Sequence, residues 1–232
     1  MIAGIRQTPF SVNWLVHRLA RQQIDSTVRA CAAGWTLDVG CGERPYDDIL
    51  AQVSNTRVGL EVDRQRYGAN TPDVWGSGAF LPFANESFDT VVSFQVLEHL
   101  AEPQQVVREI SRVLKPGGRL VLTAPHIWGI HEEPHDYFRY TGFGLSHLSH
   151  SAGLKVSSVK AMAGYWVTAG ARFCYYLQHF EKLGLSLLVR PMYAVVQVTA
   201  LVLDRLHRVE SDAWNFILVA VKDVDSGPGR SR

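Results

Sequence analysis

The stretch that most constrains the fold is Leu37–Gly42, which combines a buried-strand pattern with two closely spaced glycines. Leu37 and Val39 are typical of a parallel strand that is covered on both faces. Gly40 and Gly42 can adopt positive φ and lack a Cβ, so a ligand can approach the backbone there. A helix is predicted next, from apolar residues spaced i, i+3, i+4 and i+7: Tyr46, Ile49, Leu50 and Val53. This order is typical of the first half of a nucleotide-binding βαβ unit.

A second predicted strand, residues 57–63, places Glu61 about 20 residues beyond the glycine turn, where such units carry a ribose-binding acid. A carboxylate at this position can accept both hydroxyl protons of a ribose diol. The alternative, which we favour less, is that Glu61 and Asp63 only cap the strand at the surface. Pro45 stands where a dinucleotide fingerprint has its third glycine, which argues against a pyrophosphate seated tightly on the helix.

Four further segments follow in a recognisable order: Leu81–Phe83, Ser87–Asp89, Val96–His99 and Leu114–Gly118. Together with Leu37–Gly42 they resemble the class I S-adenosylmethionine-dependent methyltransferases, and the resemblance runs from about residue 35 to residue 154. It implies an α/β fold, a doubly wound Rossmann-like sheet of seven strands with the last strand antiparallel, together with capping helices. It also implies S-adenosyl-L-methionine as the cofactor, and it indicates almost nothing about the methyl acceptor.

The resemblance also implies which residues bind the cofactor. They are Asp38, Gly40, Cys41, Gly42, Glu61, Ser77, Gly78, Ala79 and Gln95. Ser77 departs from the family pattern, in which an acid usually reads the adenine amino group. A hydroxyl can still accept that N–H, and the backbone of Gly78 or Ala79 can face the ring. The departure therefore concerns cofactor affinity more than cofactor identity.

Composition narrows the class of protein further. The chain has 232 residues with 47% hydrophobic content, enough for one large core. Its net charge of +1 gives no indication of a nucleic-acid partner. Three cysteines without CxxC or Cys/His spacing indicate free thiols in a reducing compartment. The N-terminal residues lack a secretory h-region, so we expect a cytoplasmic protein.

We expect three parts along the chain. Residues 1–34 form an N-terminal cap with an amphipathic helix over about residues 11–30, which either covers the pocket or packs on the sheet edge. Residues 35–222 form the methyltransferase domain, with a helical insert at about 164–210. Residues 223–232 form a disordered tail.

A loop rich in histidines and acids follows the predicted strand 118–125. It leaves the carboxyl end of that strand, where open α/β sheets bind their ligands. We predict His135 as the general base, oriented by Asp136, because a neutral imidazole can accept a proton near pH 7. Tyr137 or Arg139 would hold the acceptor. The predicted catalytic residues are therefore His135, Asp136 and Tyr137.

Two alternatives concern the same region. The pair Glu98-His99 could be catalytic, but we assign it the structural role of fixing the loop after the strand. Three histidines and three acids close together in the loop also suggest a metal site. Their spacing matches no ligand motif, so no metal is predicted.

The insert is apolar, aromatic and basic. Its fixed charges are Arg172, Lys182, Arg190, Arg205 and Arg208 against Glu181 and Asp204. The uncharged run Met192–Leu203 is shorter than the roughly 20 residues that span a bilayer. Three roles for residues 164–208 stay open: a lid on the acceptor pocket, a homodimer face, or a peripheral contact with a membrane.

The predicted function is methyl transfer from S-adenosylmethionine to a small-molecule, glycan or lipid-type acceptor by in-line displacement. The segments 44–46 and 135–141 resemble bacterial methyltransferases linked to cell-envelope modification, which suggests the glycan or lipid class. One rival is a non-catalytic S-adenosylmethionine-binding subunit or scaffold, which Ser77 favours. The other is an aminopropyl transferase, which the motifs disfavour.

Overall fold

The computed structural model describes residues 8–62 and 72–224 of the chain. The strands are β1 Gly34–Val39, β2 Ser54–Glu61, β3 Val74–Trp75, β4 Phe88–Phe94, β5 Leu114–Pro125, β6 Leu154–Ala161 and β7 Asn215–Lys222. The α-helices are α1 Trp14–Cys31, α2 Asp47–Leu50, α4 Pro103–Val113, α5 Gly142–Ser151, α6 Tyr165–Phe180 and α7 Ser186–Leu206. The shorter turns of helix are η1 Leu97–His99, η2 Glu181–Leu185 and η3 Glu210–Asp212. Residues 225–232 of the predicted tail lie outside the described residues.

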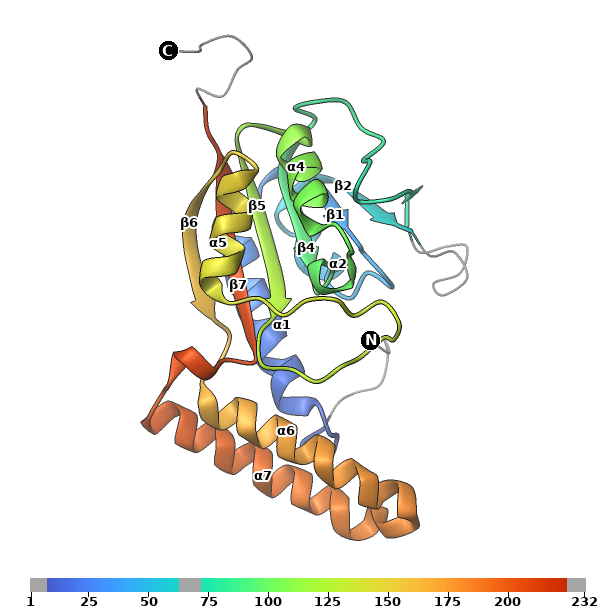
Figure 1. The fold of residues 1–232 in the computed structure, drawn as a ribbon, viewed down its shortest axis with the longest axis vertical. Coiled ribbons are helices and arrows are strands. Elements are labelled where there is room, and N and C mark those ends of the chain that lie inside the picture. The colour runs from blue at the N-terminus through green and yellow to red at the C-terminus, as the bar shows by residue number, and fades with distance from the viewer. Residues whose placement is uncertain (1–7, 63–71, 225–232) are drawn as a thin grey trace.

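The strands form one mixed sheet in the order β3-β2-β1-β4-β5-β7-β6 (Figure 1). The pairs from β3 through to β5 are parallel, and β7 runs antiparallel to both β5 and β6. The predicted doubly wound sheet with an antiparallel last strand is thus confirmed. The chain order reverses between β1 and β4, and open sheets of this kind bind ligands at that point, beyond the carboxyl ends of the strands.

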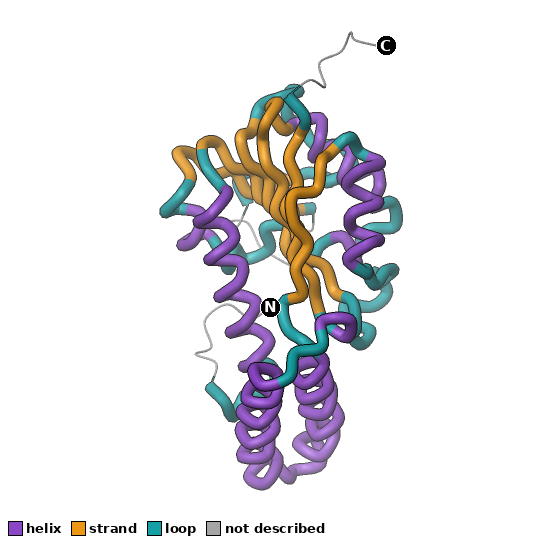
Figure 2. Tube along the Cα trace, turned by 90° about the vertical axis from the view of Figure 1, so that its left-hand side faces the viewer, coloured by secondary structure: helices purple, strands orange, loops and turns teal. Residues whose placement is uncertain are grey.

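Helices cover both faces of the twisted sheet (Figure 2). On one face, α4 and α5 bury Val107, Ile110 and Leu145 against the strands. On the other face, α1 buries Ile24 and Val28 in a second core that also includes strand and hairpin residues. The helix α1 therefore packs on a sheet face and not on a sheet edge. Both layers leave the carboxyl ends of the strands free for a site.

The helix predicted after the glycine turn is a single turn, α2. Tyr46, Ile49 and Leu50 are buried, as their spacing indicates, but Val53 lies in a non-helical turn. The difference has a simple cause, because β2 already begins at Ser54. A buried apolar triplet therefore suffices to pack one turn against the sheet without extending the helix.

The strand predicted at 118–125 begins earlier than expected. The helix α4 ends at Val113, and β5 starts at the next residue, Leu114, which pairs with Phe88. The register shifts between Phe88 and Thr90, and the proline–glycine run occupies this irregular stretch. The run follows the end of the helix directly and joins the sheet.

The predicted insert is an antiparallel pair of helices, α6 and α7, which we call the hairpin. It reverses direction at Gly184, whose φ is +89°. The two helices approach closely at Gly170, where an added Cβ would lie 2.7 Å from the Cβ of Ala200. The hairpin projects beyond the carboxyl ends of the central strands (Figures 1 and 2). Its inner end is tied to α1, because the Leu15 N–H donates to Gln197 Oε1 at 2.8 Å.

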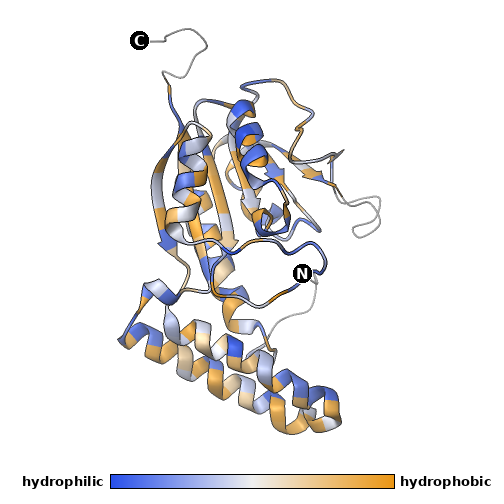
Figure 3. Cartoon of the chain, viewed as in Figure 1, coloured by the Kyte–Doolittle hydropathy of each residue, from blue (hydrophilic) through white to orange (hydrophobic). Residues whose placement is uncertain are grey.

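The hairpin is also the apolar segment of the molecule. Among the described residues, Tyr165–Leu206 is the stretch whose length and composition would suffice for crossing a membrane. Only 22% of its most apolar window is buried inside the protein. Figure 3 shows hydrophobic residues along both helices. Both helices of the hairpin also expose large apolar side chains, such as Phe173 on α6 and Leu187 on α7.

Candidate cofactor and acceptor site

The glycine turn after β1 is held in one conformation by its backbone. Gly40 has φ of +74° and Gly42 has φ of +50°. The N–H groups of Gly40 and Cys41 donate to the Leu60 carbonyl at 2.9 and 3.1 Å. A Cβ on Gly40 would lie 2.4 Å from Val96 Cγ2, so both the conformation and the space require glycine. The turn thus presents bare backbone at the carboxyl ends of β1 and β2.

Glu61, the last residue of β2, lies directly against this turn. Its side chain is buried, with 7% of the residue exposed. Its Oε2 accepts the Gly42 N–H at 3.0 Å, and its Oε1 accepts the Val62 N–H at 2.7 Å. The carboxylate predicted to bind a ribose diol is therefore fixed beside the glycine turn. Asp63, the other acid weighed from the sequence, lies outside the described residues.

Asp38 and Cys41 are both buried at the end of β1. Burial raises the pKa of Asp38 to about 7, while the nearby Arg44 guanidinium acts in the opposite direction. Burial also raises the pKa of the Cys41 thiol to about 12, so this thiol is protonated and unreactive at neutral pH. An added Cβ on Gly59 would lie 2.9 Å from Cys41 Sγ, which places the sulfur against β2. Cys41 can therefore serve a ligand only through its backbone.

The remaining predicted cofactor residues follow β3 and β4. The Ser77 hydroxyl accepts the Ala79 N–H at 3.2 Å, which closes a small turn. Gly78 is packed between β1 and α4, because an added Cβ would meet side chains of both at 3.3 Å. Gln95 has φ of +58°, and its side-chain amide donates to Thr123 Oγ1 at 2.9 Å. All the predicted cofactor residues thus lie at or just beyond the carboxyl ends of β1 to β4.

The predicted catalytic residues lie in the loop that follows β5. His135 is exposed, and its Nδ1 lies 3.1 Å from the Tyr137 hydroxyl. The Asp136 side chain is only 2% exposed, and it accepts two hydrogen bonds from Arg139, at 2.6 and 2.7 Å, and one from the His131 N–H at 2.8 Å. The Arg139 guanidinium holds the pKa of Asp136 well below its usual range. The structure therefore differs from the prediction, because Asp136 is engaged by Arg139 and His131 and not by His135.

The turn η1 anchors this loop to the end of β4. The Glu98 carbonyl accepts the N–H groups of Tyr137 and Phe138 at 2.8 and 3.3 Å. His99 Nδ1 lies 2.6 Å from the His135 carbonyl oxygen. These contacts agree with the structural role assigned to the Glu98-His99 pair. These contacts do not involve the Glu98 side chain, which is fully buried. Burial raises the pKa of the Glu98 carboxyl group to about 8.

The hairpin contacts the same loop from the other side. The ring centroids of Trp128 and Tyr175 are 5.3 Å apart, in an edge-to-face arrangement. The Arg172 guanidinium carbon lies 6.0 Å from the Trp128 ring centroid. Aromatic and cation–π contacts of this kind are each worth about 0.5–1.5 kcal/mol. The helix α6 thus supports the loop predicted to face the acceptor.

Comparison with known proteins agrees with this arrangement. Residues 37–122 match the family model described as a methyltransferase domain. A protein of Mycolicibacterium smegmatis, named a probable S-adenosylmethionine-dependent methyltransferase, is 39% identical over 102 residues, which cover 41% of this chain and 40% of that protein. The chain thus matches about two fifths of the length of its curated relatives.

Solved structures share the fold over most of the chain. The cyclase SpnF is 21% identical with a TM-score of 0.57, covering 88% of this chain and 81% of that chain. A Haemonchus contortus phosphoethanolamine N-methyltransferase, solved with S-adenosyl-L-methionine, is 13% identical with a TM-score of 0.56, covering 94% of this chain and 58% of that chain. Residues 37–122 thus carry a methyltransferase domain, as the motifs predict, and the solved structures show the shared fold.

Proposed function

We propose that the whole protein transfers a methyl group from S-adenosylmethionine to an acceptor held beneath the loop that follows β5. The observation that carries this proposal is the contact between Glu61 and the Gly42 N–H at 3.0 Å. It places a carboxylate and a bare glycine backbone together, which is the donor and acceptor set that an adenosyl ribose and its attached chain need. When bound, the sulfonium supplies an activated methyl group. The protein's task is to align the acceptor and exclude water.

On the acceptor side, the proposal relies on the loop that begins after Pro125. Its exposed imidazole, His135, lies beside the Tyr137 hydroxyl and can take a proton from an oxygen or nitrogen acceptor. The loop is anchored on η1 through Glu98, so its histidine is carried by a fixed backbone. We therefore keep His135 and Tyr137 as acceptor-facing residues and give Asp136 the role of holding the loop through Arg139.

Calorimetry with S-adenosylhomocysteine tests the cofactor part of the proposal. We expect micromolar or tighter binding that Glu61→Gln weakens at least ~10-fold, because the amide cannot accept both ribose hydroxyls with a full charge. Glu102→Gln is the matched control, since Glu102 is an exposed acid at the start of α4. The absence of heat at millimolar ligand would contradict the proposal. Binding without turnover of S-adenosylmethionine across acceptor classes would favour the non-catalytic alternative.

We further propose that the hairpin rests on an anionic membrane surface and that the acceptor is of the lipid type. Exposed apolar side chains gather at the hairpin's outer end and along α7; the most exposed are Leu183, Leu187, Leu188, Val195 and Leu206. Contiguous exposed apolar residues of this kind mark contact sites for a protein or a membrane. Basic and apolar residues combined on a helix surface favour binding at the interface of an anionic bilayer.

The charges of the hairpin favour an anionic membrane over a second copy of the chain as the partner of this surface. Glu181 is paired with Arg190 and accepts from the Tyr193 hydroxyl. Asp204 is buried and accepts the Gly164 N–H at 3.1 Å. Both acids of the hairpin are thus engaged, while Lys182 is exposed beside the apolar tip. The surface offered to a partner is therefore apolar and basic.

Flotation with lipid vesicles tests this proposal. We expect the protein to float with vesicles that contain phosphatidylglycerol, and to do so less with vesicles of phosphatidylcholine alone. The double variant Leu187→Ser with Leu188→Ser should lose flotation while S-adenosylhomocysteine binding stays unchanged. Equal recovery in the unbound fraction with both vesicle types would contradict the proposal. A dimer in light scattering that the same double variant dissociates would assign this surface to a second copy of the chain.

A further inference from the structure

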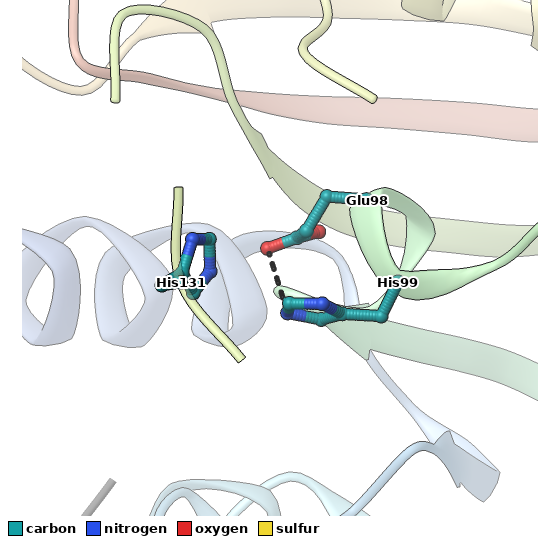
Figure 4. Close-up of side chains that lie close together, drawn as sticks. All are labelled: Glu98, His99 and His131. Carbon is teal, nitrogen blue, oxygen red and sulfur yellow. Dashed lines mark ion pairs between the residues drawn. The ribbon is translucent and has the colours of Figure 1, made fainter. Parts of the chain in front are cut away.

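Three potential metal ligands converge where β4 ends. Glu98 and His99 belong to η1, and His131 belongs to the loop that follows β5 (Figure 4). One ligand atom from each of the three lies within 4.8 Å of the others. Glu98 Oε1 and His99 Nε2 are 3.8 Å apart. The elements α4 and β5 separate His99 from His131 in the chain, so only the fold brings the set together.

The Glu98 carboxyl group points to a cation more directly than the histidines do. The residue is fully buried, and neither of its carboxylate oxygens has a hydrogen-bond partner in another described residue. A buried carboxylate without partners is costly, and such groups usually pair with a charge or coordinate a metal. Its backbone is fixed by the bonds that Tyr137 and Phe138 donate to its carbonyl. The carboxyl group is therefore held rigidly at a place where its oxygens accept no hydrogen bond from another described residue.

Both histidines carry the outer contacts that metal-binding imidazoles need. His99 Nδ1 lies 2.6 Å from the His135 carbonyl oxygen, so it can donate there and leave Nε2 as the acceptor nitrogen. His131 Nδ1 lies 3.2 Å from the Gly129 carbonyl oxygen and 3.5 Å from Asp136 Oδ2. A carbonyl or carboxylate on the second ring nitrogen fixes the tautomer and orientation of metal-bound histidines. The His99 Nε2 atom is thereby available to a cation. His131 Nδ1 also lies 3.4 Å from Arg139 Nη2, and one ring nitrogen of His131 lies within 4.8 Å of the other two ligand atoms.

We propose that Glu98, His99 and His131 bind a divalent transition-metal ion beside the acceptor side of the site. Two imidazoles and one carboxylate form a donor set suited to Zn²⁺ and its first-row neighbours. Ligand atoms at about 2.0–2.2 Å from Zn²⁺ are separated by about 3.4 Å, so a separation of up to 4.8 Å here must shorten by at most about 1.4 Å. His131 lies in a loop and can supply that movement. Glu132, whose Oε2 is 3.7 Å from His99 Nε2, adds a second carboxylate near the site.

This proposal departs from the expectation that the loop region binds no metal. The sequence alone does not indicate this set of ligands, because they come from two segments and their spacing matches no local motif. With three protein ligands, the ion would keep a coordination position for water or for an oxygen of the acceptor. This inference concerns the acceptor side alone and does not depend on cofactor binding.

Calorimetry with Zn²⁺ or Co²⁺ alone tests the inference, on full-length, metal-stripped protein without an affinity tag and without any adenosyl ligand. We expect one ion per chain with micromolar or tighter affinity, and Co²⁺ should give the visible absorption bands of a tetrahedral or five-coordinate site. His131→Gln and Glu98→Gln should each weaken binding at least ~10-fold. His150→Gln, on the exposed surface of α5, is the matched control and should bind as the wild type does.

Two outcomes would overturn the inference. One is the absence of binding at millimolar metal, and the other is wild-type affinity in both ligand variants. Because Glu98 is buried, the affinity of Glu98→Gln counts only if circular dichroism shows that this variant has the native fold. His131→Gln changes a half-buried loop residue and keeps the test decisive by itself. Since no adenosyl ligand is present, failure here leaves the proposed methyl transfer untouched, and failure of cofactor binding leaves the metal site untouched.

Discussion

Asp38 carries a carboxyl group that is buried at the end of β1, with 8% of the residue exposed. Burial raises its pKa from the ordinary 3.8 to about 7, and the negative charges of Glu61 and Asp47 add to the shift. Arg44 opposes it but does not cancel it. Near neutral pH, the group therefore holds its proton for part of the time in the folded chain.

This shift predicts how stability depends on pH. The unfolded chain releases the Asp38 proton near pH 3.8 and the folded chain only near pH 7, so the wild type loses stability across that range. Below it both states are protonated, and above it the loss is constant. Asp38→Asn has no such proton. In urea titrations we compare the unfolding free energies of the variant and the wild type. We expect the difference, variant minus wild type, to be larger at about pH 8 than at about pH 4. A difference that is independent of pH would contradict the assignment.

The Asp136–Arg139 pair predicts a second residue-level effect. Asp136→Asn removes charge-assisted bonds from a carboxylate whose side chain is only 2% exposed. We expect it to lower the unfolding free energy by about 1–3 kcal/mol and to speed hydrogen exchange in the loop that follows β5. His135→Asn is the control, because the His135 side chain is exposed and its change should stay within about 0.5 kcal/mol. Equal losses in the two variants would contradict the loop-holding role of Asp136.

For single residues, the sequence predicted which residues lie at the site better than it predicted which side chains they contact. The glycine turn and Glu61 lie together as expected, because strand ends and turn geometry are local properties. The prediction that Asp136 orients His135 was wrong. His135 is the neighbour in the chain, but Arg139 binds the carboxylate through two parallel N–H groups. Chain proximity alone could not decide between them.

Among the elements, the hairpin depends on one close contact between α6 and α7. An added Cβ on Gly170 would lie 2.7 Å from the Ala200 Cβ, and neither atom can rotate away. We expect Gly170→Val to separate the helices, to lower the unfolding free energy by about 1–3 kcal/mol and to speed hydrogen exchange in the hairpin.

Gly144→Ala is the control for this variant. Its added Cβ would meet only Thr141 Oγ1, at 3.5 Å, and the cap bond from Gly144 N–H to that oxygen would remain. We expect this change to leave stability unchanged or slightly raised, because alanine is a better helix former than glycine. If Gly170→Val unfolds at the same urea concentration as the wild type, the tight helix contact is not needed for the hairpin.

The elements themselves follow closely from the sequence. Thr141, a residue type typical of helix N-caps, caps α5 with its hydroxyl accepting the Gly144 N–H at 3.0 Å. The insert is helical as predicted, and its turn at Gly184 uses a positive φ that only glycine adopts readily. The boundaries of α2 and β5 differ because they depend on sheet pairing, which periodicity along the chain does not report.

For the whole molecule, the doubly wound sheet of seven strands with an antiparallel last strand was implied by the family resemblance of the motifs. The convergence of Glu98, His99 and His131 could not be inferred from the motifs, since it depends on how the loop after β5 folds back onto η1. The direction of the hairpin is likewise a property of tertiary packing, here through α1 and the contact of Trp128 with Tyr175. Local patterns thus predict the cofactor side of the site better than the acceptor side.

A crystal structure of the protein with S-adenosylhomocysteine tests the central claim most directly. We expect the ribose hydroxyls on the Glu61 carboxylate, the adenine against the backbone of Ser77–Ala79, and the amino-acid end beside Gly40 and Gln95. Because Ser77 Oγ already accepts the Ala79 N–H, the adenine amino group should meet backbone and not a carboxylate. A ligand bound elsewhere, or no ligand density at a saturating concentration, would contradict the assignment of the cofactor site.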